Sequence, residues 1–371
     1  MKFSVSSSDL NKALSAVIGA VPNKATLPIL ETILFQSEGG KLRLTATDLE
    51  ISIIETIEVD SEEEGAVAIP ARRLLETLRQ LPNIPVFFDV DERKNVQFRT
   101  DKGNYKLVGE DPDEFPDVPS LENATNIPTT ADAMRTAIQR TLFAVSSDDL
   151  RPAMMGVFFE VGTSESRFVA TDGHRLVRYV NKDIIASEPT NFIVPDKALS
   201  LIQKSLNGDD CTLTVSPDHA RFESGNTVLI TRLINEQYPN YDSVIPKDND
   251  KTLSISKEQM LSTVKRVSIF SSTTTRQIRL QLEADKLTIR AEDLDMSSEA
   301  KETISCEYGN DGMEIGFNAK YLADVLSHIE AEEVNFEFST PNRAGIVKPS
   351  EQADNEEILM LVMPVMLNSY N

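Results

Sequence analysis

Asp172, His174 and Arg175 lie within a stretch of four residues. Of all the residues in this chain, these three most resemble a catalytic site. A carboxylate beside an imidazole can move a proton, and an arginine can hold an anion, so a hydrolase is one hypothesis. Residues two apart share a face only on a regular strand, and no second His or Cys lies nearby to complete a metal site. The chain also lacks a phosphate-binding loop, a dinucleotide fingerprint and a nucleophile elbow. We therefore expect no catalytic residue, no metal and no cofactor.

The composition is that of an ordinary globular protein, with 371 residues of which 40% are hydrophobic and 26% charged. No run of about 18 apolar residues is present, and the N-terminus has no cleavable leader pattern, so we expect a cytoplasmic protein without membrane contact. The two cysteines, Cys211 and Cys306, are too few for a disulfide framework and lack metal-binding spacing. We expect both to be buried or half-buried thiols.

The net charge of −22 argues at first against a nucleic-acid partner, because phosphates are bound by Lys and Arg. The charge is unevenly distributed, however. Apolar residues at helical spacing predict helices over 9–20, 71–81, 130–145, 196–206, 256–270 and 319–329. These six segments sum to +6, so the rest of the chain carries −28. Helices often contain Lys and Arg, which could explain the contrast; alternatively, the helices face DNA phosphates and an acidic exterior repels DNA.

The sequence repeats itself three times at a period that suits a whole domain. One motif occurs as Ala46-Thr47-Asp48-Leu49-Glu50, Ala170-Thr171-Asp172-Gly173-His174 and Ala291-Glu292-Asp293-Leu294-Asp295. A second occurs as Ile69-Pro70-Ala71-Arg72, Val194-Pro195-Asp196-Lys197 and Phe317-Asn318-Ala319-Lys320. The copies of both motifs keep nearly the same offsets, which predicts three similar domains, 1–125, 126–250 and 251–371.

Each copy alternates strands with two helices, which predicts an α+β domain with two helices packed on antiparallel sheet. The first helix of each copy follows a capping residue: Ser8 or Asp9 in the first copy, Thr129 or Thr130 in the second, and Ser256 in the third. Segments such as 41–45 and 286–290 alternate polar and apolar residues, as strands with one buried face do.

Helix geometry limits how six such helices could surround DNA. With neighbours about 8 to 10 Å apart, six helices close into a circle near 18 Å across, which leaves no room for a duplex. Twelve helices leave a hole of roughly 25 Å, which admits a B-form duplex about 20 Å wide. A ring would therefore need two chains, and its loose hold on DNA would give no sequence specificity.

Several stretches together resemble the bacterial DNA polymerase III beta subunit, the sliding clamp family, over the whole chain. They are Thr26-Leu27-Pro28-Ile29-Leu30, Ile69-Pro70-Ala71-Arg72, Phe115-Pro116-Asp117, Ala170-Thr171-Asp172-Gly173-His174-Arg175-Leu176, Met313-Glu314-Ile315-Gly316-Phe317-Asn318 and Val362-Met363-Pro364. The resemblance implies three clamp domains per chain, which form half of a closed ring. It also implies a head-to-tail homodimer that encircles double-stranded DNA without sequence specificity. Such a ring tethers DNA polymerase for processive replication and has no catalytic activity of its own.

The resemblance further implies a groove near the C-terminus that takes short hydrophobic peptides from polymerase and clamp loader subunits. By matching position it would comprise Arg151, Met154, Thr171, Gly173, His174, Arg175, Leu176, Pro239, Val244, Leu361, Met363 and Pro364. Methionine adapts to several partners, and Gly173 would let a peptide approach the backbone. The alternative for Met363 and Pro364 is a final edge strand that packs on the third copy.

Matching positions also imply residues that face DNA and residues that join the ring. The candidates facing DNA are Lys24, Arg72, Arg73, Arg135, Arg140, Lys197 and Lys265, and those of the dimer interface are Arg73, Ile269 and Phe270. The chain departs from the family at Pro152 and Ala153, where many relatives have aromatic residues. It also continues through Asn368–Asn371, which we expect to affect access to the groove.

Two alternatives to the DNA clamp follow from the same residues. One is the hydrolase that uses Asp172, His174 and Arg175. The other is a protein-binding scaffold whose hole contains no DNA. Retention on circular DNA, with loss after linearisation, distinguishes a clamp from both.

Overall fold

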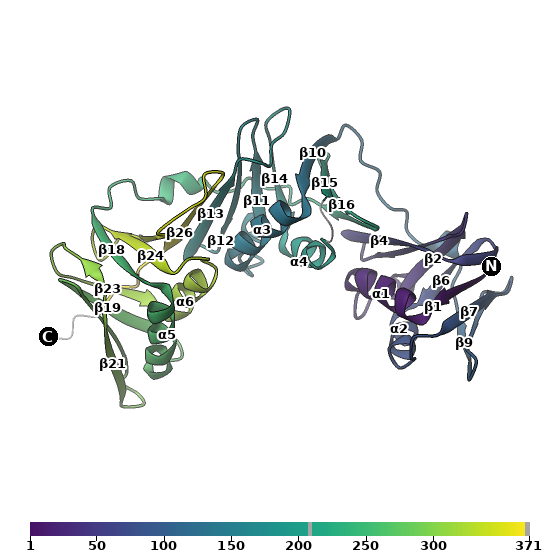
Figure 1. The fold of residues 1–371 in the computed structure, drawn as a ribbon, viewed down its shortest axis with the longest axis horizontal. Coiled ribbons are helices and arrows are strands. Elements are labelled where there is room, and N and C mark those ends of the chain that lie inside the picture. Colours follow the sequence, from purple (N-terminus) through teal and green to yellow (C-terminus); the bar gives the residue numbers. More distant parts are fainter. Residues whose placement is uncertain (207–209, 368–371) are drawn as a thin grey trace. The chain divides into compact units, whose positions relative to one another are not determined.

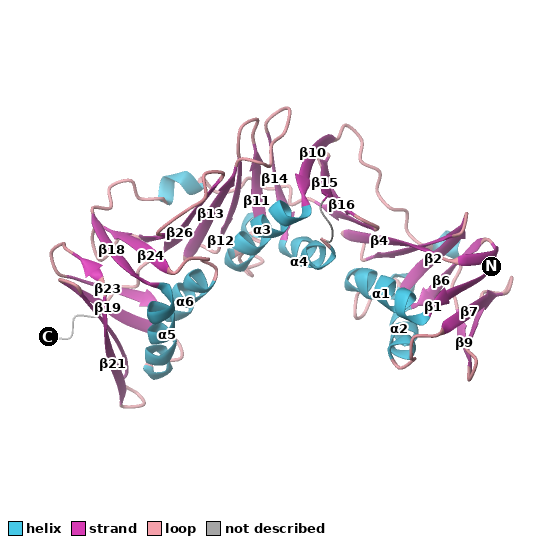
Figure 2. Cartoon of the chain, viewed as in Figure 1, coloured by secondary structure: helices cyan, strands magenta, loops and turns pink. Residues whose placement is uncertain are grey.

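The computed structural model describes residues 1–206 and 210–367. Packing divides the chain into two compact units, each built from two segments of sequence. Unit 1 comprises Met1–Arg135 with Lys197–Leu233, and unit 2 comprises Thr136–Asp196 with Ile234–Asn371. Both units combine helices with extensive antiparallel sheet (Figures 1 and 2).

Unit 1 contains two antiparallel sheets and the first pair of helices. The five-stranded sheet has the order β5 (Asp60–Glu63), β1 (Lys2–Ser6), β7 (Pro85–Val90), β8 (Asn95–Arg99) and β9 (Asn104–Val108). The eight-stranded sheet has the order β10 (Thr125–Thr130), β15 (Asp210–Val215), β16 (His219–Ser224), β17 (Thr227–Arg232), β4 (Ile51–Glu58), β3 (Lys41–Thr47), β2 (Thr32–Glu38) and β6 (Gly65–Pro70). The helices are α1 (Ser7–Val17) and α2 (Ala71–Arg79), with short 3-10 helices η1 (Ile18–Ala20), η2 (Pro28–Glu31) and η3 (Pro112–Glu114).

Unit 2 also contains two antiparallel sheets and a pair of helices. Its nine-stranded sheet has the order β14 (Thr190–Pro195), β11 (Gly156–Val161), β12 (Ser166–Thr171), β13 (Arg175–Asn181), β26 (Glu356–Val362), β25 (Gly345–Pro349), β24 (Glu333–Phe338), β18 (Lys251–Ser256) and β22 (Glu307–Tyr308). Its four-stranded sheet has the order β21 (Ser298–Ser305), β20 (Lys286–Asp293), β19 (Gln277–Glu283) and β23 (Met313–Asn318). The helices are α5 (Lys257–Val267) and α6 (Ala319–Ser327), with η4 (Leu142–Ala144), η5 (Pro152–Met154), η6 (Tyr241–Val244) and η7 (Ser268–Phe270). The division between the units falls within α3 (Ala131–Thr141) and α4 (Asp196–Ser205).

The first helix of each sequence repeat begins at a side chain that caps its N-terminus. Thr130 accepts a hydrogen bond from a first-turn amide at 3.1 Å, and Ser256 does so at 3.4 Å, as predicted. The cap predicted for α1 at Ser8 or Asp9 is wrong, because the helix starts earlier and Ser6 caps it. Asp9 instead lies in the first turn, where its carboxylate interacts favourably with the helix dipole.

The helices end sooner than the apolar pattern predicts. The last residues of the predicted segments 9–20, 130–145 and 256–270 form the 3-10 turns η1, η4 and η7. A 3-10 turn tightens a helix end. In η1 and η4 the turn still buries Ala20 and Ala144, whereas Ile269 and Phe270 of η7 are exposed. Within the described ranges, no helix is long and apolar enough to cross a membrane.

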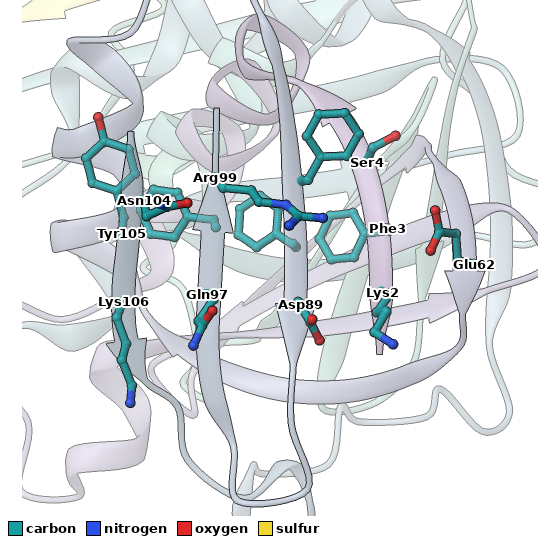
Figure 3. A pocket seen from close by; sticks show the side chains of 13 residues that line it. Lys2, Phe3, Ser4, Glu62, Asp89, Gln97, Arg99, Asn104, Tyr105 and Lys106 are labelled. Atoms are coloured by element: carbon teal, nitrogen blue, oxygen red, sulfur yellow. The ribbon is translucent and has the colours of Figure 1, made fainter. Parts of the chain in front are cut away.

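The five-stranded sheet shows why alternating residues produce one buried face. Phe3, Phe88 and Phe98 occupy one row across neighbouring strands and are buried, with stacked rings 4.8 and 5.4 Å apart. The next row along the strands faces solvent and carries Lys2, Asp89, Gln97 and Lys106 (Figure 3). Beyond the buried row on its other side, Arg99 lies over the exposed ring of Phe87, with its guanidinium carbon 5.9 Å from the ring centroid. The core therefore lies on the face away from these polar rows.

The observed architecture confirms the α+β prediction. In unit 1, α1 packs against α2 and against β4, and in unit 2, α5 packs against α6 while α6 contacts β23 and β26. Strands of different sequence repeats pair directly, β17 with β4 and β13 with β26. Each of the two units therefore contains sheets whose strands come from more than one sequence repeat. The domain boundaries at 125 and 250 stay a prediction.

Gly156 in β11 is a position where the fold tolerates no side chain. A Cβ atom there would lie 2.4 Å from the carbonyl oxygen of Val194 in the paired strand β14. We expect Gly156→Ala to lower the free energy of unfolding by about 1 to 3 kcal/mol, because backbone has to move. Gly309→Ala, where the added Cβ meets nothing within 4 Å, should change it by less than about 0.5 kcal/mol. Urea unfolding followed by circular dichroism measures both, and equal effects would contradict the steric explanation.

Candidate functional site

A groove of about 520 Å³ opens on unit 2 beside the ends of β12, β13 and β26. Nine predicted groove residues line it: Met154, Thr171, Gly173, Arg175, Leu176, Pro239, Val244, Leu361 and Met363. Its other lining residues were missed by the sequence analysis: Asn240, Tyr241, Ser243, Ile245, Pro246, Lys247, Asp248, Asn342, Arg343 and Ala344. Arg151, His174 and Pro364 were predicted but are not among the lining residues. A groove of this volume suits a few residues of extended peptide.

The residues missed by sequence reasoning come from two connecting segments. Residues 238–246 read as a proline-rich linker before the third copy, and the sequence pattern assigns no role to 342–344. Composition marks such segments as loops but does not say what they pack against. In the structure, the apolar side chain of Val244 on this loop is exposed beside the groove.

The repeated sequence motif is a tight turn in which an aspartate caps backbone amides. Asp172 Oδ1 accepts from the amides of His174 and Arg175 at 2.9 and 3.0 Å, while Thr171 Oγ1 accepts from the amide of Gly173 at 3.1 Å. Gly173 has φ +86, and an added Cβ would lie 2.7 Å from Nη1 of Arg151. Glycine thus permits both the left-handed backbone and the approach of Arg151.

The first repeat builds the same turn from different residues. Asp48 Oδ1 accepts from the amides of Glu50 and Ile51 at 3.0 and 2.7 Å, and Leu49 has φ +77. In the third repeat, Asp293 Oδ1 accepts from the amides of Asp295 and Met296 at 3.0 and 3.2 Å. The repeated motif therefore encodes a turn in all three copies.

Arg175 connects the groove to helix α6 through charge and stacking. Its Nε donates to Asp172 Oδ2 at 3.2 Å and its Nη1 to Asp324 Oδ2 at 2.5 Å, while Nη2 donates to the carbonyl of Phe143 at 2.7 Å. The guanidinium carbon lies 5.3 and 5.2 Å from the ring centroids of Phe143 and Tyr321. Arg175 is only 8% exposed, so this cluster of contacts holds the side chain in place.

The contacts of Asp172 and His174 are those of a structural turn. Asp172 uses its oxygens for two backbone amides and for Arg175, and the His174 ring stacks on Tyr321 with centroids 5.3 Å apart. In the part of the chain that the structure describes, no group of three or more His, Cys, Asp or Glu suits a metal ion. Cys211 is a buried free thiol as expected, and burial raises its pKa to about 11. Cys306 is a half-buried free thiol.

Aromatic and aliphatic side chains form a rigid floor under the groove. Leu176 and Leu361 face each other across β13 and β26 and belong to one buried cluster with Tyr238 and Tyr241. The Tyr241 hydroxyl donates to Glu160 Oε2 at 2.6 Å, and burial raises the pKa of Tyr241 above its usual value. A hydroxyl that stays protonated keeps this hydrogen bond. The floor is therefore apolar and fixed.

The seven candidates for DNA contact fall into two groups. Lys24, Arg73 and Lys265 are exposed. Arg72 is also exposed and donates to the carbonyl of Val21 at 3.2 Å. Lys265 lies in the last turn of α5, and no ion pair is recorded for it within residues 1–206 and 210–367. These four side chains present charge to solvent.

The other three candidates are engaged in contacts inside their units. Arg135 pairs with Asp132 and donates to the carbonyl of Leu206 at 2.6 Å, and Lys197 pairs with Asp48. Arg140 is mostly buried and bridges two glutamates, Glu330 at 3.4 Å and Glu356 at 3.5 Å. Its guanidinium also lies over the ring of Tyr179, 5.4 Å from the centroid. The resemblance to the family, applied position by position, did not distinguish these engaged cations from the exposed ones.

Comparison with known proteins gives matches along nearly the whole chain. Models of the DNA polymerase III beta subunit match as N-terminal domain over residues 1–119, central domain over 128–240 and C-terminal domain over 242–365. The beta sliding clamps of Pseudomonas aeruginosa and Vibrio cholerae are 32% and 29% identical, covering 99% of this chain and 100% of each relative.

Solved structures give the same result. The P. aeruginosa sliding clamp bound to griselimycin has a TM-score of 0.94 at 31% identity. The Bacillus subtilis polymerase sliding clamp also has a TM-score of 0.94, at 26% identity. Each alignment covers 99% of this chain and 100% of the other.

Removing Arg175 should destabilise unit 2 strongly. Arg175→Ala leaves Asp172 and Asp324 without their cation, so we expect the free energy of unfolding to fall by about 3 kcal/mol. Arg232→Ala breaks an ion pair with Glu50 whose side chains are 64% and 63% exposed, and it should cost less than about 1 kcal/mol. Urea unfolding measures both variants, and a similar small loss in each would show that the Arg175 contacts add little.

Proposed function

Because this chain belongs to the DNA polymerase III beta subunit family, the sliding clamps, we propose that the groove of unit 2 receives short hydrophobic peptides of DNA polymerase and clamp loader subunits. A sliding clamp tethers the polymerase to duplex DNA, which raises the local concentration of enzyme at the template. In this family the clamp is a homodimeric ring, closed only when two chains join. The observation that carries the proposal is the apolar groove with exposed hydrophobic side chains at its rim.

The chemistry of the groove supports a hydrophobic peptide as its ligand. Leu176 and Leu361 make an apolar floor, while Val244 and Met363 remain 52% and 40% exposed. Exposed apolar side chains around a hollow gain free energy when a partner covers them. The flexible thioether of Met363 adapts to different partner side chains, which suits a site that serves several proteins.

Arg151 and His174 are proposed to contact the peptide beside the lined groove rather than inside it. Arg151 passes close to Gly173 and pairs with Asp148 at 2.8 Å, so its position is fixed. The amide of Met363 donates to the His174 carbonyl at 2.8 Å, which joins the turn to the chain leading to Pro364. Asn368–Asn371, expected to affect access, lie outside the described residues.

We assign no catalytic step to this protein. The relatives are named sliding clamps, a family of non-catalytic processivity factors. The carboxylate of Asp172 and the ring of His174 are engaged in turn and stacking contacts, which argues against the hydrolase hypothesis. Because the protein acts on replicating DNA, we place its activity in the bacterial cytoplasm.

The ring joint is proposed to bury the exposed side chains of η7. Ile269 is 77% exposed and Phe270 is 41% exposed, although both are large and apolar. Burying such side chains contributes about 1.5 to 3 kcal/mol each, a reason for a second chain to cover them. The exposed Arg73 supplies a cation for the same joint.

Two unpaired strand edges provide a further reason for chains to associate. Strand β9 ends the five-stranded sheet of unit 1. Strand β21 ends the four-stranded sheet of unit 2 and contacts η7, which carries Ile269 and Phe270. An unpaired edge presents amide and carbonyl groups that can bind another strand. We propose that β9 of one chain and β21 of its partner lie at the joint.

A negative charge in the groove should abolish peptide binding. We expect Met363→Glu to lower the affinity for polymerase peptides at least about tenfold, because a carboxylate would be desolvated among apolar groups. Met366→Glu is the matched control, since Met366 is 77% exposed and is not a lining residue. Fluorescence anisotropy with a labelled peptide measures both. Equal affinities for both variants would place the peptide site elsewhere.

Exposed cations should determine how firmly the loaded ring holds DNA. We expect Lys24→Glu with Lys265→Glu to shorten retention on circular DNA and to reduce the salt dependence of binding, since each lysine contacts about one phosphate. Lys41→Glu with Lys286→Glu makes the same charge change on strands β3 and β20 and serves as the control. Gel filtration of loaded circles before and after linearisation gives the measurement. Loss from circular and linear DNA at equal rates would contradict encirclement.

A further inference from the structure

One part of the groove is charged, although its floor is apolar. Lys247, Asp248 and Arg343, here named the charged bracket, all line it. Asp248 and Arg343 form an ion pair that joins the loop after η6 to the turn between β24 and β25. The bracket is therefore built from two segments that the fold brings together.

Hydrogen bonds to backbone carbonyls hold these two segments in place. Asn249 Nδ2 donates to the carbonyl of Glu337 at 2.8 Å and to that of Ala344 at 3.3 Å. The Arg343 amide donates to the Thr340 carbonyl at 3.1 Å. The hydrogen bond from Arg343 also holds the pKa of Asp248 below its usual range. These contacts anchor the two segments, while the side chain of Arg343 itself stays 52% exposed.

Within the described part of the chain, the bracket has an unpaired positive charge, whereas the other two arginines in or beside the groove are paired with carboxylates. Arg151 pairs with Asp148, and Arg175 pairs with two aspartates. Lys247 is exposed, and no ion pair is recorded for it among the described residues. Its ammonium and the remaining N–H groups of Arg343 are donors available to an anion. In a chain of net charge −22, this excess of one positive charge lies where a peptide would dock.

We propose that the charged bracket selects partner peptides with an acidic side chain next to their hydrophobic anchor. This inference rests on the peptide groove of the proposed function and adds a determinant of partner choice. Bracket residues are exposed, so a peptide can continue past them, and a side-chain carboxylate therefore fits better than a chain terminus. Ion pairs at exposed sites are weak, so the bracket adds selectivity while the apolar contacts supply most of the affinity.

Two capped peptides test the inference, identical except for Glu or Gln directly after the apolar anchor. Wild-type protein should bind the Glu peptide about two- to fivefold more tightly at low salt, and the preference should vanish at high salt. Lys247→Gln should abolish most of the preference. Asp248→Asn should enlarge it, because the carboxylate that competes for Arg343 is removed. Fluorescence anisotropy measures each affinity.

Lys251→Gln is the matched control, since Lys251 follows on the same segment but pairs with Asp250 and is not a lining residue. The Lys251→Gln variant should keep the full preference for the Glu peptide. If its preference falls as far as that of Lys247→Gln, long-range charge explains the effect and the bracket is refuted. Equal affinity of wild-type protein for the Glu and Gln peptides would also refute it. A Gln peptide with a free C-terminal carboxylate that binds better than the capped Glu peptide would refute the choice of an acidic side chain.

The Gln peptide separates this inference from the proposed function. If the Gln peptide binds the wild-type protein but not the Met363→Glu variant, the peptide groove is supported. The difference in affinity between the Glu and Gln peptides then tests the charged bracket alone. If neither peptide binds wild-type protein, the peptide groove itself is refuted.

Discussion

The groove depends on the hydrogen-bonded pairing of β13 with β26, strands from distant parts of the sequence. The register of this pair places Leu176 opposite Leu361 and Arg175 opposite Val362. The same pairing brings the carbonyl of His174 to the amide of Met363. An antiparallel ladder admits only one register in which both strands bury their apolar side chains, so the floor and rim are set together. Arg175 then connects this strand pair to α6.

One local motif serves different ends in the three repeats because its surroundings differ. The turns at Asp48, Asp172 and Asp293 all use an aspartate oxygen to hold two backbone amides. Only Gly173 combines the left-handed backbone with room for an arginine, Arg151, to lie against it. In the first repeat Leu49 occupies the corresponding position and is exposed. A shared turn therefore becomes part of a binding site through one residue without a side chain.

Charge has similarly different roles at residues that look alike in sequence. Arg140 is held between two glutamates and an aromatic ring, whereas Lys265 ends a helix in solvent. The first contributes to the stability of its unit, and the second can meet a phosphate without losing a partner. The net charge of a helix does not distinguish the two, because pairing depends on what the fold places beside each cation.

Local pattern determined much of this protein. The three repeats, the strands and helices, the caps at Thr130 and Ser256 and the α+β class all follow from residue spacing, because periodicity and capping act over a few residues. Nine of the nineteen residues that line the groove followed from the resemblance to a family.

Tertiary structure decided the rest. The cap at Ser6, the parts of the groove wall at 240–243, 245–248 and 342–344, and the separation of engaged from exposed cations could not be read from the chain. Each depends on contacts between residues far apart in sequence, and spacing along a chain does not encode which loop, carboxylate or ring will lie beside a given side chain.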